Sequence, residues 1–517
     1  MPDKTILLVE AELGGELPPS QWQQGRLVAM GLFRSKYLGS LTRYDVPGNY
    51  AKGLHCWNDM CRDNWGFELG GIHQCKALGG CGVMNGALMQ LTHPANFDSW
   101  PEGWRAQDLQ SFVRMAQRDF HITQTPSADG RHYLSDAGGN FVRRAFEKYG
   151  GAAGGFVEDN TTQPRGGIFH VPHVSAKDGV RQSTAQMCLL RFQYGLGLVL
   201  PEVFHVNFTC RGICRSICRG IKSICRYLPE ALKRPNFKLL KMKRATKIET
   251  VAGTQATGVR VKDEETGDED TLQLKDGGLV VVTAGAINTP RLLLRSGITG
   301  YGTVGKTIKD HSLWHQMFRC WRDNDPKTYG EVTDQIMSQY LHDRSGALAQ
   351  FGPILMGFWK DPRTSGGNDQ YDVEFFLGPQ AEVGRLALHV ALMRDTCSNA
   401  EMVLNPDGTI KLEGSPRNAC AHDIITMEHA LGWLDHMLGS AGCHKEGETE
   451  RSWAFNHWAG SCALGACVDP QSLRVRGTMN VAVADASITP TTIWAHPALT
   501  LKGIAFKAAD VLAKSMP

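Results

Sequence analysis

The chain has 517 residues, of which 42% are hydrophobic and 21% charged, and its formal net charge is +3 at pH 7. This is the composition of a soluble globular protein, and the length predicts two or more domains or one large discontinuous domain. The low net charge, and the lack of any apolar run near the ~20 residues that span a bilayer, give no reason to expect nucleic-acid binding or a membrane span.

The first predicted element is a strand at residues 6–9, Ile-Leu-Leu-Val, which Glu10 follows directly. Dinucleotide-binding sheets often end their second strand in this way, with an acid that binds a ribose hydroxyl and a glycine-rich turn about 20 residues upstream. Here only residues 1–5 precede the strand. The segment is therefore either a cofactor site that lacks its first half or an ordinary edge strand.

Glycines are dense between residues 66 and 103, above all in Gly-Gly-Cys-Gly-Val-Met-Asn-Gly at 79–86. Clustered glycines let a backbone approach a flat or charged ligand and offer it N–H donors. The spacing matches neither a phosphate-binding loop nor G-x-G-x-x-G, because Asn85 stands in place of the third glycine. On these residues alone, a tight turn into a helix is the favoured interpretation.

Strands are predicted at 235–251 and 256–262, and 278–298 reads as a buried strand, a small-residue turn and a helix that starts near Pro290. Residues 310–450 alternate strands and helices without glycine motifs. The chain then returns to glycine-rich turns and ends in a helix at 499–515. This order predicts an α/β nucleotide-binding domain interrupted by a second, sheet-based domain.

Residues 186–226 differ from the rest of the chain. Cys210, Cys214, Cys218 and Cys225 would share one face of a helix, with arginines and a lysine between them. Thiolates bind zinc or iron–sulfur clusters, although this spacing is not the usual C-x2-C knuckle. A low-complexity insertion or a translated intron is the favoured interpretation, and a metal site or a basic patch for nucleic acid are the alternatives.

Two histidines near the end of the chain are candidates for proton chemistry. His457 and His496 both lie beside apolar and glycine-rich turns. A lone histidine is more often structural, and two in such a setting strengthen the case for a general acid–base site while a structural role stays the alternative. The buried strand predicted from residue 481 ends in Asp485, where a carboxylate suits a sugar or ribityl hydroxyl and a turn-forming role is the alternative.

Blocks in order along the chain resemble the glucose–methanol–choline (GMC) oxidoreductase family of FAD enzymes. They are KALGGCGVMNGALM (76–89) with HPANFDSW (93–100), TAGAINTPRLLLRSGI (283–298) with VGKTIKDH (304–311), and the segment from Asn456 to Thr500. Within the family, the likeness is closest to the flavodehydrogenase domain of cellobiose dehydrogenase. It rests on residues 40–50, 128–134 and 232–239 and on Asn-His-Trp at 456–458.

The resemblance implies an α/β fold with two domains. One is a Rossmann-like, discontinuous FAD-binding domain at 1–100, 178–310 and 455–517, in which the first strand and glycine loop have no counterpart. The other is an α+β substrate-binding domain with an antiparallel sheet at 101–177 and 311–454. In relatives the residues on either side of 186–226 are nearly contiguous, which identifies that segment as an insertion.

The resemblance also implies an FAD-dependent dehydrogenase or oxidase that acts on a CH–OH group of a sugar or another alcohol. His457 would be the general base, and hydride would pass from carbon to the flavin. His496 would hydrogen-bond the developing alkoxide, and Asn456 would bind a sugar hydroxyl. Phe455 replaces a small polar residue of the cellobiose enzymes, which argues against a disaccharide substrate.

The implied cofactor is noncovalent FAD, because Met84 stands where members with covalent flavin carry a histidine. Glu10 would bind the adenosine ribose and Ala245 the adenine. The remaining implied cofactor contacts are Gly79, Gly80, Gly82, Asn85, Gly86, Ala87, Ala284, Gly285, Asp485, Ala486 and Pro497. No metal ligand is expected.

The expected partners are a small-molecule alcohol or sugar and an electron acceptor, which is a quinone, a dye-like acceptor or oxygen. No nucleic acid and no membrane span are expected. The sequence starts without the apolar segment of a signal peptide, although the resemblance allows an extracellular protein. The alternative function is a truncated or inactive GMC-family fragment that binds FAD poorly or not at all, because the pyrophosphate loop is missing.

Overall fold

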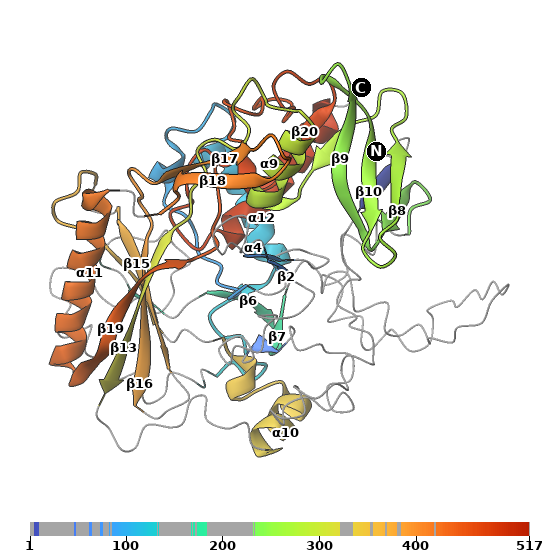
Figure 1. Cartoon of the computed structure of the whole chain (residues 1–517). Coiled ribbons are helices and arrows are strands. Elements are labelled where there is room, and N and C mark those ends of the chain that lie inside the picture. Colours follow the sequence, from blue (N-terminus) through green and yellow to red (C-terminus); the bar gives the residue numbers. More distant parts are fainter. Residues whose placement is uncertain are drawn as a thin grey trace.

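The structure of the chain, shown in Figure 1, is a computed structural model. It describes residues 5–9, 46–47, 62–64, 73–75, 82, 85–131, 133, 167, 169–170, 173–182, 231, 233–320, 334–351, 355–367, 370–379, 384–417 and 420–515. Several features named from the sequence lie outside these residues, namely Glu10, Gly79, Gly80, Met84 and the segment 186–226.

A six-stranded antiparallel sheet forms one part of the molecule, in the order β19-β13-β16-β15-β14-β5. Its strands are β5 (Phe169–His170), β13 (Ser312–Cys320), β14 (Leu355–Trp359), β15 (Val373–Pro379), β16 (Arg385–Leu392) and β19 (Cys443–Ala454). A disulfide joins Cys320 to Cys443, which are register partners on β13 and β19.

One helix, α11 (Ala421–Ser440), covers a face of this sheet (Figure 1). Its buried positions recur every three or four residues, as in Met427, Leu431, Leu434 and Leu438, and this spacing gives a helix one apolar stripe. The stripe packs with side chains of β13, β14, β15 and β16 in a single cluster.

The other part is built on two pairs of parallel strands. β1 (Ile6–Val9) pairs with β8 (Phe237–Leu240), and β12 (Val280–Val282) pairs with β20 (Val481–Val483). Helix α9 (Gly285–Arg295) follows β12 at once, which is the strand-then-helix order of a dinucleotide-binding unit. The predicted α/β fold is confirmed, whereas the predicted domain boundaries stay a prediction.

The remaining elements surround these two parts. Strands β9 (Lys243–Val251), β10 (Gln255–Asp263) and β11 (Glu269–Gln273) form an antiparallel sheet, and α4 (Ala106–Asp119) packs against α12 (Ala498–Ser515). Short elements are β2 (Arg62–Asn64), β3 (His73–Cys75), η3 (Pro94–Phe97), β4 (Ile122–Thr123), β6 (Val174–Lys177), β7 (Val180–Arg181), α10 (Asp334–Asp343), η6 (Ala347–Ala349), β17 (Asn399–Leu404), β18 (Ile410–Ser415) and η7 (Ala486–Ile488).

The predicted start of the helix near Pro290 is wrong, because α9 begins at Gly285 and contains that proline. A proline inside a helix leaves the carbonyl four residues earlier without its N–H donor. Here that carbonyl belongs to Ala286, and it accepts a hydrogen bond of 2.6 Å from the Ser461 hydroxyl. A side chain distant in sequence therefore satisfies the group that the proline leaves open.

Two predicted strands also differ from the structure. The strand expected over 235–251 is divided into β8 and β9, and Met242 between them has a left-handed backbone with φ of 57°. The strand expected to end in Asp485 ends at Val483. The closing helix and the first strand, at 6–9, lie where they were expected. None of the helices in the described segments is long and apolar enough to cross a membrane.

The contact between α12 and α4 generates the first prediction. A Cβ added at Gly503 would lie 2.6 Å from Val113 Cγ2 and 3.1 Å from its Cα. Gly503→Ala should therefore lower the free energy of unfolding by about 1–3 kcal/mol, because the two helices must move apart. Gly432→Ala is the matched control: it lies within α11 with open space around it, and the change should stabilise by up to about 1 kcal/mol. Equal effects of the two changes in urea unfolding would contradict this account.

Candidate active site

His457 lies in the loop that follows β19, and a buried carboxylate holds its backbone. Asp310 accepts hydrogen bonds from the backbone N–H groups of His457, at 2.7 Å, and Asn456, at 3.2 Å. Asn456 has a left-handed backbone with φ of 61°, a conformation that asparagine tolerates better than most residues. The carboxylate thereby stabilises an uncommon backbone that turns the histidine into the site.

Asp310 is fully buried beside Arg417, whose Nε lies 3.2 Å from Oδ2. Burial raises the pKa of Asp310 to about 6, and Arg417 and the backbone N–H groups act in the opposite direction. The guanidinium of Arg417 also lies over the ring of Trp458, 5.2 Å from its centroid. One carboxylate thus connects the histidine loop to the residues that follow β18.

Three histidine rings meet around this loop. Nδ1 of His457 lies 3.0 Å from Nδ1 of His311, and the ring centroids of His457 and His496 are 5.2 Å apart. On its other side, Nδ1 of His496 contacts Oε1 of Glu374, a fully buried carboxylate on β15. The structure therefore brings the two predicted catalytic histidines together and adds His311 and Glu374 to them.

Burial keeps two of these rings neutral at ordinary pH. Burial lowers the pKa of His457 well below its usual value, and the neighbouring His496 and His311 lower it further. The pKa of His311 falls to about 3, chiefly through burial and then through His496. A neutral imidazole keeps a free lone pair on one nitrogen, so it can accept a proton.

Aromatic rings surround the histidines. The ring of Phe455 lies 3.9 Å from that of His457 and 5.0 Å from that of His496, measured between centroids. Phe376 of β15 meets His496 edge to face at 5.5 Å. Asn456, predicted to bind a sugar hydroxyl, is exposed, and its Oδ1 accepts a hydrogen bond of 3.3 Å from the Trp458 indole.

The ends of β12 and β20 bring four predicted cofactor residues together. Ala284 and Gly285 follow one strand, and Asp485 and Ala486 follow the parallel strand beside it. Both oxygens of Asp485 already accept hydrogen bonds from protein groups, which are Gly285 N at 2.9 Å, Thr289 Oγ1 at 2.5 Å and Ser487 N at 2.8 Å. Asp485 therefore ties the start of α9 to β20, and binding a ribityl hydroxyl would be a second role.

The glycine-rich block is described only at Gly82 and from Asn85 onward. The Asn85 side chain turns toward the protein, where its Oδ1 accepts from Ala87 N and from Arg181 Nη1, each at 3.0 Å. Ala87 has a left-handed backbone with φ of 54°. This geometry folds the backbone of residues 85–87 into a tight turn, with Gly86 at its centre.

The last two predicted cofactor residues lie far apart in the fold. Pro497 stands directly before α12, so the positive N-terminal end of that helix lies beside His496. The first turn of α12 carries no acidic side chain that would offset this charge. Ala245 is in β9, paired with Val261 of β10, and β9 contacts β1. Ala245 is thus in a strand that contacts β1, the strand directly before Glu10.

Trp458 connects the histidine loop to the strand ends. It packs in one cluster with Ala286 and Ile287 of α9 and with Ala486. His457 therefore lies next to the edge where dinucleotide-binding sheets hold their ligand.

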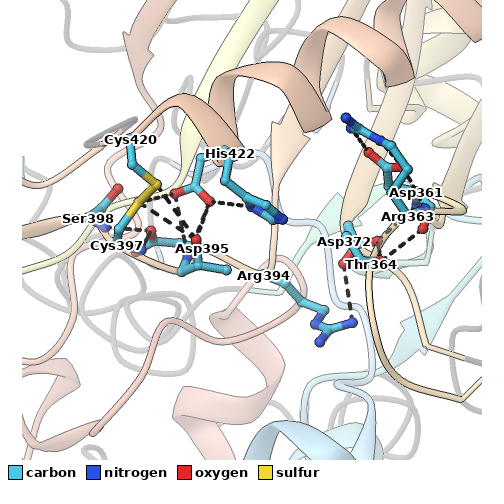
Figure 2. A network of polar contacts seen from close by, with 12 residues as sticks. Asp361, Arg363, Thr364, Asp372, Arg394, Asp395, Cys397, Ser398, Cys420 and His422 are labelled. Carbon is cyan, nitrogen blue, oxygen red and sulfur yellow. Dashed lines mark hydrogen bonds and ion pairs between the residues drawn. A yellow bond between two sulfur atoms is a disulfide. The ribbon is translucent and has the colours of Figure 1, made fainter.

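Figure 2 shows a polar cluster that includes the disulfide between Cys397 and Cys420. The Cys397–Cys420 bond adjoins Asp423, which accepts a hydrogen bond of 2.6 Å from the Thr396 hydroxyl. Sulfur and carboxylate atoms of Cys397, Cys420 and Asp423 lie within 4.8 Å of one another, a metal-like grouping. Both sulfurs are consumed in the disulfide, so this cluster offers no thiolate for a metal.

Arg394 contacts both Asp372 and Trp494. Its Nη1 lies 3.2 Å from Asp372, and its guanidinium lies over the ring of Trp494, 5.1 Å from the centroid. Trp494 is two residues from His496, so the same segment carries the arginine contact and a candidate catalytic ring.

Sequence reasoning missed Asp310, His311 and Glu374. Asp310 and His311 end the block VGKTIKDH, which entered only as part of the family resemblance. The sequence does not show that they contact the loop of His457, so it assigned them no role. Nothing in the sequence marks Glu374, because its partner His496 lies on a different element.

A parallel α/β unit with small residues at the ends of its strands is typical of proteins that bind a dinucleotide cofactor at that edge. Comparison with known families narrows this class. The chain belongs to the GMC oxidoreductase family, whose N-terminal model matches residues 70–207 and 209–313 and whose C-terminal model matches residues 381–505. Members of this family are FAD-binding flavoproteins that act on alcohol or sugar donors.

Similar proteins include bacterial and animal relatives. An uncharacterized GMC-type oxidoreductase of Rhodococcus erythropolis is 23% identical over 477 residues, covering 85% of this chain and 83% of the relative. The FAD- and quinone-dependent glucose dehydrogenase of Drosophila melanogaster is 23% identical over 489 residues, covering 80% and 70%. The particular closeness to cellobiose dehydrogenase stays a prediction.

Among solved structures, a variant of formate oxidase from Aspergillus oryzae RIB40 resembles the chain with a TM-score of 0.69 and 17% identity, covering 99% of this chain and 94% of that one. Identity this low shows a shared fold and no more.

The buried carboxylate generates the second prediction. In Asp310→Asn one oxygen faces two N–H donors, so the loop that carries His457 should shift, and a displacement of about 1 Å costs a catalyst about 100-fold in rate. The rate of flavin reduction by substrate should fall by that order, while the visible flavin spectrum is retained. Asp435→Asn on the exposed face of α11 should change neither.

The same variant tests the raised pKa. Because the folded pKa of Asp310, about 6, exceeds its ordinary value of 3.8, ionisation costs the folded state stability as pH rises between these values. The difference in free energy of unfolding, wild type minus Asp310→Asn, should therefore fall from pH 4 to pH 6 and then level off. A difference that grows over this range in urea unfolding would refute the assignment.

Proposed function

We propose that the protein is an FAD-dependent oxidoreductase that oxidises a CH–OH group of a sugar or another alcohol. The observation that carries the proposal is the pair His457 and His496, whose rings lie 5.2 Å apart beside the ends of the parallel strands. One neutral ring to take a hydroxyl proton and a second to hold the oxygen are what this oxidation requires of a protein.

The roles of the two rings follow from their contacts. Nδ1 of His457 is directed at His311, which leaves Nε2 to accept the proton of the substrate hydroxyl. Nδ1 of His496 is directed at Glu374, which leaves Nε2 to hydrogen-bond the substrate oxygen. When bound, FAD supplies the acceptor for the hydride that leaves the substrate carbon.

The described residues fit a flavin nucleotide. Small residues, Ala284, Gly285 and Ala486, follow β12 and β20, where a backbone can approach a ligand closely. The N-terminus of α12 adds a positive end beside His496, which suits the electron-rich oxygens of a flavin ring. We propose noncovalent FAD on the ground that Met84 takes the place of the histidine that binds flavin covalently.

The rings around the site bear on the substrate. Phe455 and Phe376 present apolar surfaces to the two histidines, and aromatic rings contribute area rather than hydrogen bonds. This environment favours an alcohol with an apolar or aromatic body over a disaccharide. Oxygen, a quinone or a dye-like compound would then reoxidise the flavin, and the rate of reoxidation by dissolved oxygen separates an oxidase from a dehydrogenase.

The third prediction tests the general base. His457→Ala should retain flavin absorbance but lose the bleaching that an alcohol substrate causes, by about 100-fold or more in rate. The control His436→Ala removes an exposed histidine from α11 and should bleach as the wild type does. Unchanged bleaching in His457→Ala would reject the assigned base. Wild-type protein that is colourless and takes up no added FAD would favour the alternative of an inactive family member.

The fourth prediction concerns pH. A base must be deprotonated to act, and the pKa of His457 is held well below its usual value by burial. The rate of flavin reduction should therefore stay constant from about pH 8 down through about 6.5, the ordinary histidine pKa, and fall only at more acidic pH. A rate that already declines above pH 6.5 in single-turnover measurements would contradict the depressed pKa.

A further inference from the structure

His311 is the residue behind the candidate base, and its place is unusual. It stands directly before β13 and is fully buried, and its Nδ1 lies 3.0 Å from Nδ1 of His457. The two rings meet nearly at right angles, with 83° between their planes. At this distance the two nitrogens share one hydrogen bond, so one of them carries the proton and the other offers a lone pair.

Two arrangements of that proton are possible while both rings are neutral. If His457 carries it on Nδ1, its Nε2 has the lone pair that a general base needs. If His311 carries it instead, His457 holds its own proton on Nε2 and cannot act as a base there. The direction of one hydrogen bond therefore decides whether the ring that faces the substrate is functional.

The proposed role of His457 selects between the two, because a base at its Nε2 requires its own proton on Nδ1, and Nδ1 of His311 must then accept in the shared hydrogen bond. Burial is the main influence on the pKa of His311 and lowers it, and the backbone carbonyl of Ile493 acts in the opposite direction, as an acceptor near a ring N–H does. Because Nδ1 faces His457, the nitrogen left for this carbonyl is Nε2. Nε2 is buried and makes no hydrogen bond within the described residues, so the carbonyl of Ile493 is a weak influence on it. A carbonyl can only accept, so it agrees with a proton on Nε2 and with Nδ1 of His311 as the acceptor.

We propose that His311 is a positioning residue that fixes His457 as the tautomer with its proton on Nδ1 and so exposes the Nε2 lone pair to the substrate. This inference rests on the proposed role of His457 as the base. It assigns His311 no contact with substrate or cofactor.

The arrangement also suits the step itself. When Nε2 of His457 takes the substrate proton, the ring becomes a cation, and its Nδ1–H bond to the neutral His311 strengthens as a charge-assisted bond. The other titratable groups around the pair are His496, which contacts Glu374, and Asp310, which contacts Arg417 and the His457 backbone. Among the described residues neither carboxylate contacts the His311 ring, so His311 is the group that accepts the hydrogen bond from Nδ1–H of His457.

The test compares two substitutions of similar size. In His311→Asn the amide oxygen takes the place of Nδ1 and can still accept from His457, whereas His311→Leu offers no acceptor. A merely structural role for His311 would be disturbed by both changes alike. Thermal unfolding and the visible flavin spectrum report whether each variant folds and holds its cofactor.

The first readout does not depend on activity. Long-range nitrogen–proton NMR spectra of protein labelled with 15N-histidine distinguish the two tautomers, and the His457 signals are assigned as those missing in His457→Ala. The wild type and His311→Asn should show His457 protonated on Nδ1, and His311→Leu should show a mixture or the other tautomer. A wild-type His457 protonated on Nε2, or a His311→Leu ring that keeps the proton on Nδ1, would overturn the inference.

The second readout is the rate of flavin reduction by an alcohol that bleaches the wild type. We expect about a 100-fold loss in His311→Leu, a loss of less than about tenfold in His311→Asn, and little change in the substrate concentration that gives half the maximal rate. Equal rates in both variants would overturn the inference. If no alcohol bleaches the wild type, the proposed function fails, and the NMR result still decides the tautomer.

Discussion

The site depends on one buried carboxylate that accepts two backbone N–H groups. Asp310 lies directly before His311, so a single dipeptide fixes both the backbone of His457, through the carboxylate, and its ring, through Nδ1. Burial of a carboxylate is costly unless hydrogen bonds or charges offset it, and here Arg417 and the N–H groups of residues 456 and 457 offset part of that cost. All of these contacts are between groups of the protein itself, so they hold the backbone of His457 in place without a ligand.

The site draws on both parts of the molecule. Glu374 and His311 come from the six-stranded sheet and its edge, His457 follows the last strand of that sheet, and His496 precedes the final helix. In the proposed site, His457 and His496 are each oriented through Nδ1 by a protein group, and Nε2 of each is left for chemistry. Contacts between segments that are distant in sequence therefore specify the positions of these side chains.

Much of the fold could be predicted where the signal is local. The strand at 6–9 and the closing helix follow from short-range apolar patterns, and the two histidines follow from a resemblance with characteristic residues. Local rules failed where a distant residue intervenes: Ser461 satisfies the carbonyl that Pro290 leaves open, so α9 starts earlier than the proline suggests. Glu374 was invisible for the same reason, because its partner lies on another element.

The contact between Asp310 and the residues after β18 has a consequence for local opening. The Asp310 N–H donates to the carbonyl of Pro416 at 3.0 Å, and Arg417 pairs with the carboxylate, so the hairpin of β17 and β18 is fastened to the histidine loop. Such contacts join neighbouring segments into one cooperative unit of unfolding. Exchange of the His457 amide hydrogen with solvent would then report the opening of that unit. A change that destabilises the hairpin of β17 and β18 would also increase exchange at the candidate base.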